Sequence, residues 1–279
     1  MTAALPMYDL PARARATDAL YAAVRRAAAE RGIALPAERQ QGAAAMALAR
    51  ARDTVLTQTC GFPFAWRGDP VRPVTTPAYA APGCDGPLYR SAIVARTDGP
   101  ARLAEAAGAR VAVNEALSQS GHQALRLAVA VAGLSRPGGF LGPAVATGSH
   151  AASLDAVREG RADLAAIDAV TLALIHDTAP WRVAGLVAIG WSAARPGLPL
   201  VTALGAVEAG ALSDAFDACL ADPALAETRA VLRLVGAERL PASAYAVLAG
   251  DARWADAAGE PWYLPDPTAP RAAAEDQKS

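Results

Sequence analysis

The residues best suited to chemistry form a short polar loop, Ser118-Gln119-Ser120-Gly121, which separates an apolar run from a helical pattern. The apolar run at 111–113 is typical of a strand, and apolar residues recur at helical spacing from Leu125 onward. The first turn of a helix leaves backbone N–H groups without partners and carries a partial positive charge. Two hydroxyls and a glycine there would add donors to an unobstructed backbone, as a tetrahedral oxyanion such as phosphate requires. The alternative is that Ser118 or Ser120 simply caps the helix.

Two further polar loops also stand between a strand pattern and a helical pattern: Thr147-Gly148-Ser149-His150 and Ile167-Asp168-Ala169. Helix N-termini that follow parallel strands lie at one edge of the sheet, so their free amides can converge on one anion. His150 would add a donor, although a core histidine is the alternative. Asp168 is explained equally well as a helix cap. Next to an anion, its carboxylate would have to accept a proton from a phosphoryl hydroxyl or an amino group of the ligand, because two bare anions repel.

A polar turn at 58–63 is a second candidate for lining the same cleft. It follows a strand pattern at 54–58, and ligands of open α/β sheets bind at the carboxyl ends of strands. Gln58 and Thr59 would present amides or side chains there. Cys60 in this turn and Cys84 in a later glycine-containing loop could approach each other. We expect them to be reduced neighbours, because the three cysteines form neither a disulfide framework nor a zinc-ligand spacing.

Strand and helix patterns alternate along most of the chain, which predicts an α/β protein with parallel sheets covered by helices. The patterns predict strands at 4–8, 54–58, 72–76, 89–96, 111–114, 163–167, 183–191 and 200–203. They predict helices at 14–31, 43–52, 103–107, 120–132, 149–159, 169–175, 208–221 and 224–232, and a partly extended segment at 140–147.

Composition excludes several classes of protein. The chain has 279 residues, of which 53% are hydrophobic, enough for a sizeable core. A net charge of −1 and a pI of about 6.3 argue against nucleic-acid binding. The sequence has no apolar run of the length that crosses a membrane, so we expect no membrane insertion. The start of the chain, Met1 to Asp9, has neither the basic nor the apolar region of a signal peptide, which predicts a cytoplasmic location for the chain as written.

Three motifs in this order resemble the phosphate-, phosphite- and phosphonate-binding proteins of ABC transporters. They are Ser-x-Ser-Gly at the start of a helix, then Thr-Gly-Ser-His, then Gly-Arg-Ala-Asp-Leu-Ala-Ala-Ile-Asp. The resemblance extends from Leu5 to Thr202 and implies the type II periplasmic-binding-protein fold, with two α/β lobes joined by two crossover strands around a ligand cleft. By this analogy the crossings are 89–96 and 198–203. Lobe one is 1–92 plus 199–279, and lobe two, which carries the anion-binding helix N-termini, is 93–198.

The resemblance also implies roles for individual residues. Ser118, Gln119 and Ser120, with His150, correspond to the group that holds the phosphoryl oxygens. Asp168 would lie opposite them, and Tyr8 and Tyr89 would close over the ligand. This chain departs from the family's usual pattern, which has a threonine between the two serines and an aromatic residue after the glycine, where this sequence has Gln119 and His122. The family is normally periplasmic, so a misassigned start of the chain is an alternative to a cytoplasmic location.

The leading hypothesis is a solute-binding protein for a small phosphorus oxyanion, monomeric and without cofactor, metal or chemistry of its own. An ABC transporter permease is the partner that the resemblance implies. Two alternatives remain: a cytoplasmic ligand sensor that acts through a partner protein, or an enzyme on the same fold with His150 as base or Cys60 as nucleophile. The sequence contains no recognisable Ser/His/Asp or Cys/His order and no metal-ligand cluster, which disfavours the enzyme.

Overall fold

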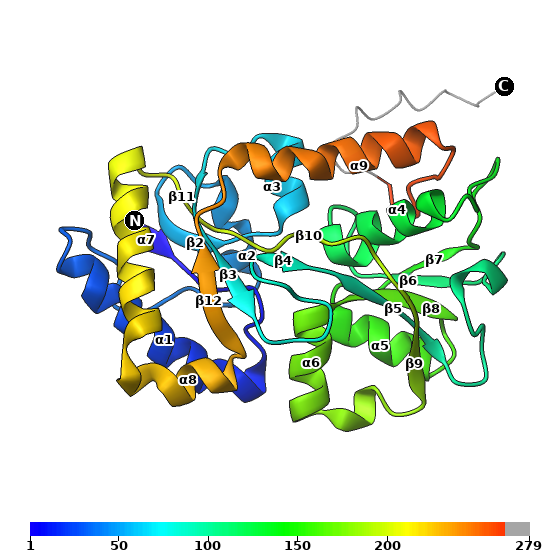
Figure 1. The fold of residues 1–279 in the computed structure, drawn as a ribbon, viewed down its shortest axis with the longest axis horizontal. Coiled ribbons are helices and arrows are strands. Elements are labelled where there is room, and N and C mark those ends of the chain that lie inside the picture. Colours follow the sequence, from blue (N-terminus) through cyan, green and yellow to red (C-terminus); the bar gives the residue numbers. More distant parts are fainter. Residues whose placement is uncertain (266–279) are drawn as a thin grey trace, which may run out of the picture.

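A five-stranded sheet near the N-terminus takes its strands from distant parts of the chain. The computed structural model describes residues 1–265 and places this sheet at the left of Figure 1. Its strand order is β1-β2-β11-β3-β12. The strands are β1 (Thr2–Ala3), β2 (Thr54–Gln58), β3 (Arg72–Tyr79), β11 (Leu200–Thr202) and β12 (Leu234–Glu238). Strands β1 and β2 are parallel, whereas β11 runs antiparallel to both of its neighbours and β12 antiparallel to β3.

Three helices pack together beside this sheet: α1 (Ala14–Ala29), α7 (Ala206–Ala221) and α8 (Ala226–Val231). Helix α1 buries Leu20, Val24 and Ala28, which recur every four residues and therefore lie on one face. They join Leu56 of β2 and Phe216 of α7 in one apolar cluster. We call this sheet with α1, α7 and α8 the first lobe.

A second five-stranded sheet has the order β7-β6-β8-β5-β9. Its strands are β5 (Ser91–Arg96), β6 (Val111–Val113), β7 (Ala144–Ala146), β8 (Leu164–Asp168) and β9 (Leu186–Trp191). Strand β6 is parallel to β7 and β8, whereas β5 is antiparallel to β8 and β9. Together with α4 (Ala124–Val131), α5 (His150–Arg158) and α6 (Ala169–Thr178), this sheet forms what we call the second lobe.

The central strands of the second sheet are covered on both faces, which explains their unbroken apolar runs. In β5, Ile93 and Ala95 point into the cluster beneath α4, whereas Ala92 and Val94 point into the cluster beneath α5 and α6. Strand β8 alternates in the same way. This packing fixes where β6 and β8 end, and therefore where the polar loops that follow them lie.

The chain passes between the lobes through a two-stranded antiparallel pair, β4 (Leu88–Tyr89) with β10 (Arg195–Pro196). The sequence places the crossings at 89–96 and 198–203. Those ranges consist largely of β5 and β11, which lie inside the five-stranded sheets. The division of the chain into 1–92 plus 199–279 and 93–198 stays a prediction, and residues 266–279 of it lie outside the described part.

Helix α9 (Ala246–Ala257) extends from the first lobe toward α4 of the second (Figure 1), and it packs on α3 (Gly61–Arg67) as well as on α4. The buried Arg126 of α4 holds the segment that follows α9. Its guanidinium donates to the carbonyl oxygens of Glu260 at 2.7 Å and Pro261 at 2.8 Å, and it pairs with the Asp256 carboxylate. A cation therefore ties the end of the described chain to the second lobe.

The prediction of parallel sheets is wrong, because both sheets are mixed. Alternation of strands and helices does not fix strand direction. Strand β11 follows the return crossing through β10 and enters the first sheet between β2 and β3, antiparallel to both. The expected strand at 4–8 is also wrong: pairing with β2 involves Thr2 and Ala3, and the chain then leads to Tyr8 in a left-handed conformation with φ of 64°.

The sequence prediction misses helix α3, strand β12, helix α9 and the short strand β10. Helix α3 occupies part of the expected turn at 58–63, and it forms because Phe62 and Phe64 pack against Tyr245 and Leu248 near the other end of the chain. Strand β12 and helix α9 have no counterpart in the sequence prediction. Within residues 1–265, no helix has both the length and the apolarity to cross a bilayer.

Replacing Arg126 with leucine is expected to lower the free energy of unfolding by about 3 kcal/mol or more, because two carbonyls and a carboxylate lose their cationic partner. Urea denaturation would measure the change. Arg102→Leu is the control, since the Arg102 side chain is 75% exposed and pairs with Glu105 at the surface, where the loss should stay below about 1 kcal/mol. Equal losses in the two variants would contradict this role for Arg126.

Candidate anion-binding site

The loop after β6 continues into a π-helical turn, Gln119–Gln123, that leads into α4. Its two serines have different partners. Ser118 Oγ accepts a hydrogen bond from the Gly121 backbone N–H at 3.0 Å and is the helix cap. Ser120 Oγ lies 2.8 Å from Nε2 of His150, which follows the loop after β7. Of the two serines, Ser118 therefore accounts for the capping and Ser120 is available for another contact.

Gly121 permits the close approach of these two loops. A Cβ atom at this position would lie 1.9 Å from Asn114 Oδ1 and 3.1 Å from His150 Cε1. The first distance is closer than non-bonded atoms can come without a shift of the structure, and the second is tighter than most contacts of a Cβ atom. The absence of a side chain at residue 121 thus brings the start of α4 next to the start of α5.

His150 is the first residue of α5, and Ser149 caps that helix by accepting a hydrogen bond from the Ala152 N–H at 3.1 Å. Burial lowers the pKa of His150 to about 4, with a backbone contact at Ala166 acting in the opposite direction. At neutral pH the ring is therefore uncharged. An uncharged imidazole can donate one hydrogen bond and accept another.

Asp168 has two partners, one from each lobe. Its Oδ1 accepts the Thr171 N–H at 2.9 Å, which caps α6, and its Oδ2 accepts the Tyr8 hydroxyl at 3.0 Å. The carboxylate is therefore the helix cap that the sequence allows and also a contact between the lobes, whereas its role as a ligand contact stays a prediction. Burial raises the pKa of Asp168 to about 6, although the hydrogen bonds from Thr171 and Tyr8 act to lower it.

Tyr8 and Tyr89 come from different elements. The Tyr8 ring packs edge to face on Tyr79, with 4.9 Å between centroids. Burial, and then the nearby Asp168 carboxylate, raise the pKa of Tyr8 well above its ordinary value. Tyr89 belongs to β4, between the lobes. Burial also raises the pKa of Tyr89, and contact with Ser120 acts against that rise. Tyr89 therefore lies beside Ser120, which contacts His150, and Tyr89 is also near Cys60 and Asp168.

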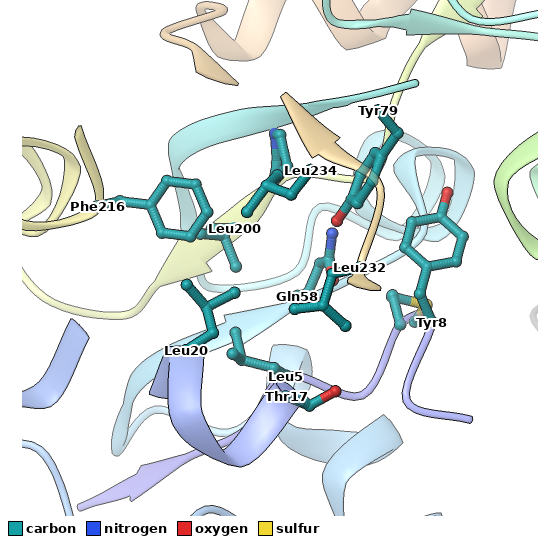
Figure 2. Close-up of a pocket in the computed structure, with 12 residues that line it drawn as sticks. Leu5, Tyr8, Thr17, Leu20, Gln58, Tyr79, Leu200, Phe216, Leu232 and Leu234 are labelled. Carbon is teal, nitrogen blue, oxygen red and sulfur yellow. The ribbon is translucent and has the colours of Figure 1, made fainter. Parts of the chain in front are cut away.

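Gln58 and Thr59 bind the returning chain. Gln58 Nε2 donates to the Leu198 carbonyl at 3.1 Å, and the Thr59 N–H donates to the Pro199 carbonyl at 3.1 Å. Gln58 also lines a cavity of about 30 Å³ with Tyr8 and Tyr79, where Figure 2 shows its amide beside the Tyr79 hydroxyl. Five of the twelve residues that line the cavity are leucines, and the volume suits about one or two water molecules. This cavity is too small and too apolar for a phosphate-type anion.

Sequence reasoning gave no site role to Tyr79 and Asn114. Tyr79 contacts both Tyr8 and Gln58, and it ends β3, three residues beyond the strand expected at 72–76. A longer strand would have placed it at the carboxyl end, where site residues gather. Asn114 follows β6 and meets Gly121 through a contact that local sequence does not reveal.

The cysteines of the structure are free, and Cys60 lies at the site. Its Sγ accepts the Gln119 backbone N–H at 3.3 Å, a bond from the turn before α4 to the start of α3. Burial raises the pKa of Cys60 to about 11, so the thiol is protonated at neutral pH and is a poor nucleophile. In the described part of the chain, no three His, Cys, Asp or Glu side chains gather as a metal site requires.

Three solved structures share the fold of this chain at low sequence identity. A binding-protein component of an ABC phosphonate transporter from Pseudomonas aeruginosa has a TM-score of 0.72 at 16% identity, over 92% of this chain and 87% of that one. PhnD1 of Prochlorococcus marinus, solved with methylphosphonate, has a TM-score of 0.67 at 14% identity, over 90% and 96%. XAC2383 of Xanthomonas citri, solved with chloride, has a TM-score of 0.69 at 15% identity, over 92% and 98%. The fold is that of a two-lobed type II periplasmic binding protein.

Residues 3–247 match the family described as ABC transporter, phosphonate, periplasmic substrate-binding protein. The chain belongs to this family of phosphonate-binding proteins, which confirms the resemblance seen in its sequence. No curated protein matches the chain.

The Asp168 carboxylate predicts a specific pH dependence of stability without ligand. Its pKa is raised on folding, so its contribution to stability is fully present below about pH 4 and is lost as the pH rises through about 6. Asp168→Asn keeps a helix-capping side chain without the charge. Relative to this variant, the parent should lose up to about 3 kcal/mol of unfolding free energy between pH 4 and pH 7.

Urea denaturation of both proteins at several pH values would measure that difference, and the subtraction removes the opposite effect of the buried histidines. The prediction would be contradicted if the difference in unfolding free energy between parent and variant did not change with pH, or if the parent became relatively more stable as the pH rises.

Proposed function

We propose that this chain binds a small phosphorus oxyanion, phosphate, phosphite or a phosphonate, between its two lobes. The observation that carries the proposal is the pairing of Ser120 with His150 where two helices begin. Each helix start offers partial positive charge, and the two side chains add donors without a net charge of their own. In this proposal the protein is the binding component of an ABC transport system, and its partner is the permease.

The proposed site has donors to hold the phosphoryl oxygens. Ser120, the His150 ring and the Tyr89 hydroxyl lie together, and the Gln119 N–H points at the Cys60 sulfur. Sulfur is a weak acceptor, so exchanging it for a charged oxygen would strengthen that bond. Ser118 contributes by fixing the turn, with its own hydroxyl oxygen engaged as a cap.

Asp168 would select the protonation state or the substituent of the ligand. A carboxylate repels a fully ionised phosphoryl group but accepts a hydrogen bond from a P–OH group or from an ammonium group. The raised pKa of Asp168 also allows the carboxyl group itself to carry a shared proton near neutral pH. Tyr8, bound to Asp168 from the first lobe, would contact the ligand when the lobes are together.

A binding role without catalysis agrees with the ionisation of the site. The Cys60 thiol is protonated, and within residues 1–265 no carboxylate is hydrogen-bonded to the His150 ring to orient it as a base. Gln58 and Thr59, which bind the returning chain, would support the floor of the cleft from β2.

Isothermal titration calorimetry should detect binding of at least one of methylphosphonate, phosphite and phosphate with a dissociation constant of about 1 μM or lower. This corresponds to about −8 kcal/mol, which several charge-assisted hydrogen bonds can supply after ordering costs. Acetate, which lacks the tetrahedral geometry, is the control. Absence of heat with all three phosphorus compounds would refute the proposal.

The two serines allow a matched test by mutation. Ser120→Ala should weaken binding by about 10- to 150-fold, because it removes a donor to a charged oxygen. Ser118→Ala should instead lower stability by about 0.5–2 kcal/mol through loss of the cap. Ser120→Asp should abolish binding, because it places a negative charge where the anion would lie.

Calorimetry and thermal denaturation of each variant would separate affinity from stability. A folded Ser120→Asp variant that binds as tightly as the parent would exclude Ser120 from the site.

A further inference from the structure

Helix α6 is bound to the first lobe at both of its ends. Figure 1 shows it on the side of the second lobe that faces the first. At its start, Asp168 accepts the Tyr8 hydroxyl. In its last turn, Asp177 meets two arginines: Arg13, just before α1, and Arg233, between α8 and β12. The two ends are about 14 Å apart, so Asp177 lies well away from the proposed anion site.

The contact at Asp177 has a defined geometry. Arg233 binds the carboxylate with two parallel hydrogen bonds, both 2.8 Å long, and Arg13 adds a third at 3.1 Å. All three side chains are less than 30% exposed. The Arg233 guanidinium holds the pKa of Asp177 below its usual value. A bidentate pair with a second cation has a more defined geometry, and contributes more to stability, than an ordinary surface ion pair.

The backbone supports the same assignment. Tyr8 and Arg233 are the two non-glycine residues with positive φ between residues 1 and 265, at 64° and 55°. Such conformations are unfavourable for L-residues and persist where surrounding structure holds them. Arg233 is held by a backbone bond from the Ala80 N–H and by its own bond to the Ala80 carbonyl. Both strained residues of the first lobe therefore bind opposite ends of one helix in the second.

We propose that Asp177, with Arg13 and Arg233, is an interlobe latch that determines ligand affinity without contacting the ligand. The latch holds α6 against the first lobe and so keeps Asp168 beside Tyr8. The apparent affinity of a ligand that binds between the lobes falls in proportion to the fraction of molecules in which the lobes are together. Loss of the latch lowers that fraction, although every residue proposed to contact the ligand is still present.

The first test needs no ligand and is independent of the proposed function. Asp177→Asn, and more strongly Asp177→Lys, should increase the radius of gyration measured by small-angle scattering, since the lobes lose their attraction or repel. Asp177→Glu should restore the parent value. Asp163→Asn is the matched control: Asp163 is similarly exposed and makes a bidentate pair with Arg110, but both residues belong to the second lobe.

The second test rests on the proposed anion site and uses methylphosphonate as the probe. Asp177→Asn should weaken its binding by about 5- to 150-fold, the usual range for coupling between separate sites, whereas Asp163→Asn should leave it unchanged. If the parent protein does not bind methylphosphonate, the proposed ligand is wrong. The scattering measurement still tests the latch in that case, because it needs no ligand. Asp177→Lys with the parent radius of gyration, or equal effects at Asp177 and Asp163, would overturn the proposal.

Discussion

The close approach at Gly121 is the constraint on which the candidate site depends. A single Cβ atom there would collide with Asn114, which follows β6, and would crowd His150, which begins α5. Without a side chain at that position, two helix starts that belong to different crossovers come together. In the proposed site, the partial positive charge at both helix starts favours a small anion over a cation.

The rest of the fold keeps these two helix starts in place. Apolar residues of β5 and β8 alternate between two clusters, so the second sheet is fixed from above and below. Helix α9 and Arg126 add a tie between the lobes on the side of α4. Helix α6 joins the lobes elsewhere, through Tyr8 at one end and two arginines at the other. The buried Asp168 carboxylate belongs both to the Tyr8 contact between the lobes and to the proposed site.

Local sequence was sufficient wherever a feature depends on neighbours along the chain. The strand at 54–58, the long helix at 14–31, the three polar loops and the order of motifs that identifies the family all have local signatures. Strand direction has no local signature, because it depends on the direction in which the chain re-enters a sheet. The sequence therefore predicts parallel sheets, whereas both are mixed. Helix α3 depends on aromatic packing against a segment far along the chain and was read as a turn.

The sequence groups these residues into one candidate site, whose ligand-binding role stays a prediction, but it does not show what each of them contacts. Ser118 and Ser120 look equivalent in sequence, and only the geometry assigns the cap to Ser118 and the histidine contact to Ser120. Gln58 and Thr59 lie at the carboxyl end of β2, as the sequence predicts. The antiparallel strand β11 brings the carbonyl groups of Leu198 and Pro199 close enough to accept hydrogen bonds from them. Their partners follow from tertiary structure, as does the contact between Gly121 and Asn114.

The most direct measurement of the central claim is a crystal structure of the protein grown with methylphosphonate. We expect the phosphorus atom between the starts of α4 and α5, with phosphoryl oxygens within hydrogen-bonding distance of Ser120 Oγ, His150 Nε2 and the Gln119 N–H. A ligand bound elsewhere, with the Ser120–His150 hydrogen bond intact and no phosphoryl oxygen near either residue, would contradict the account.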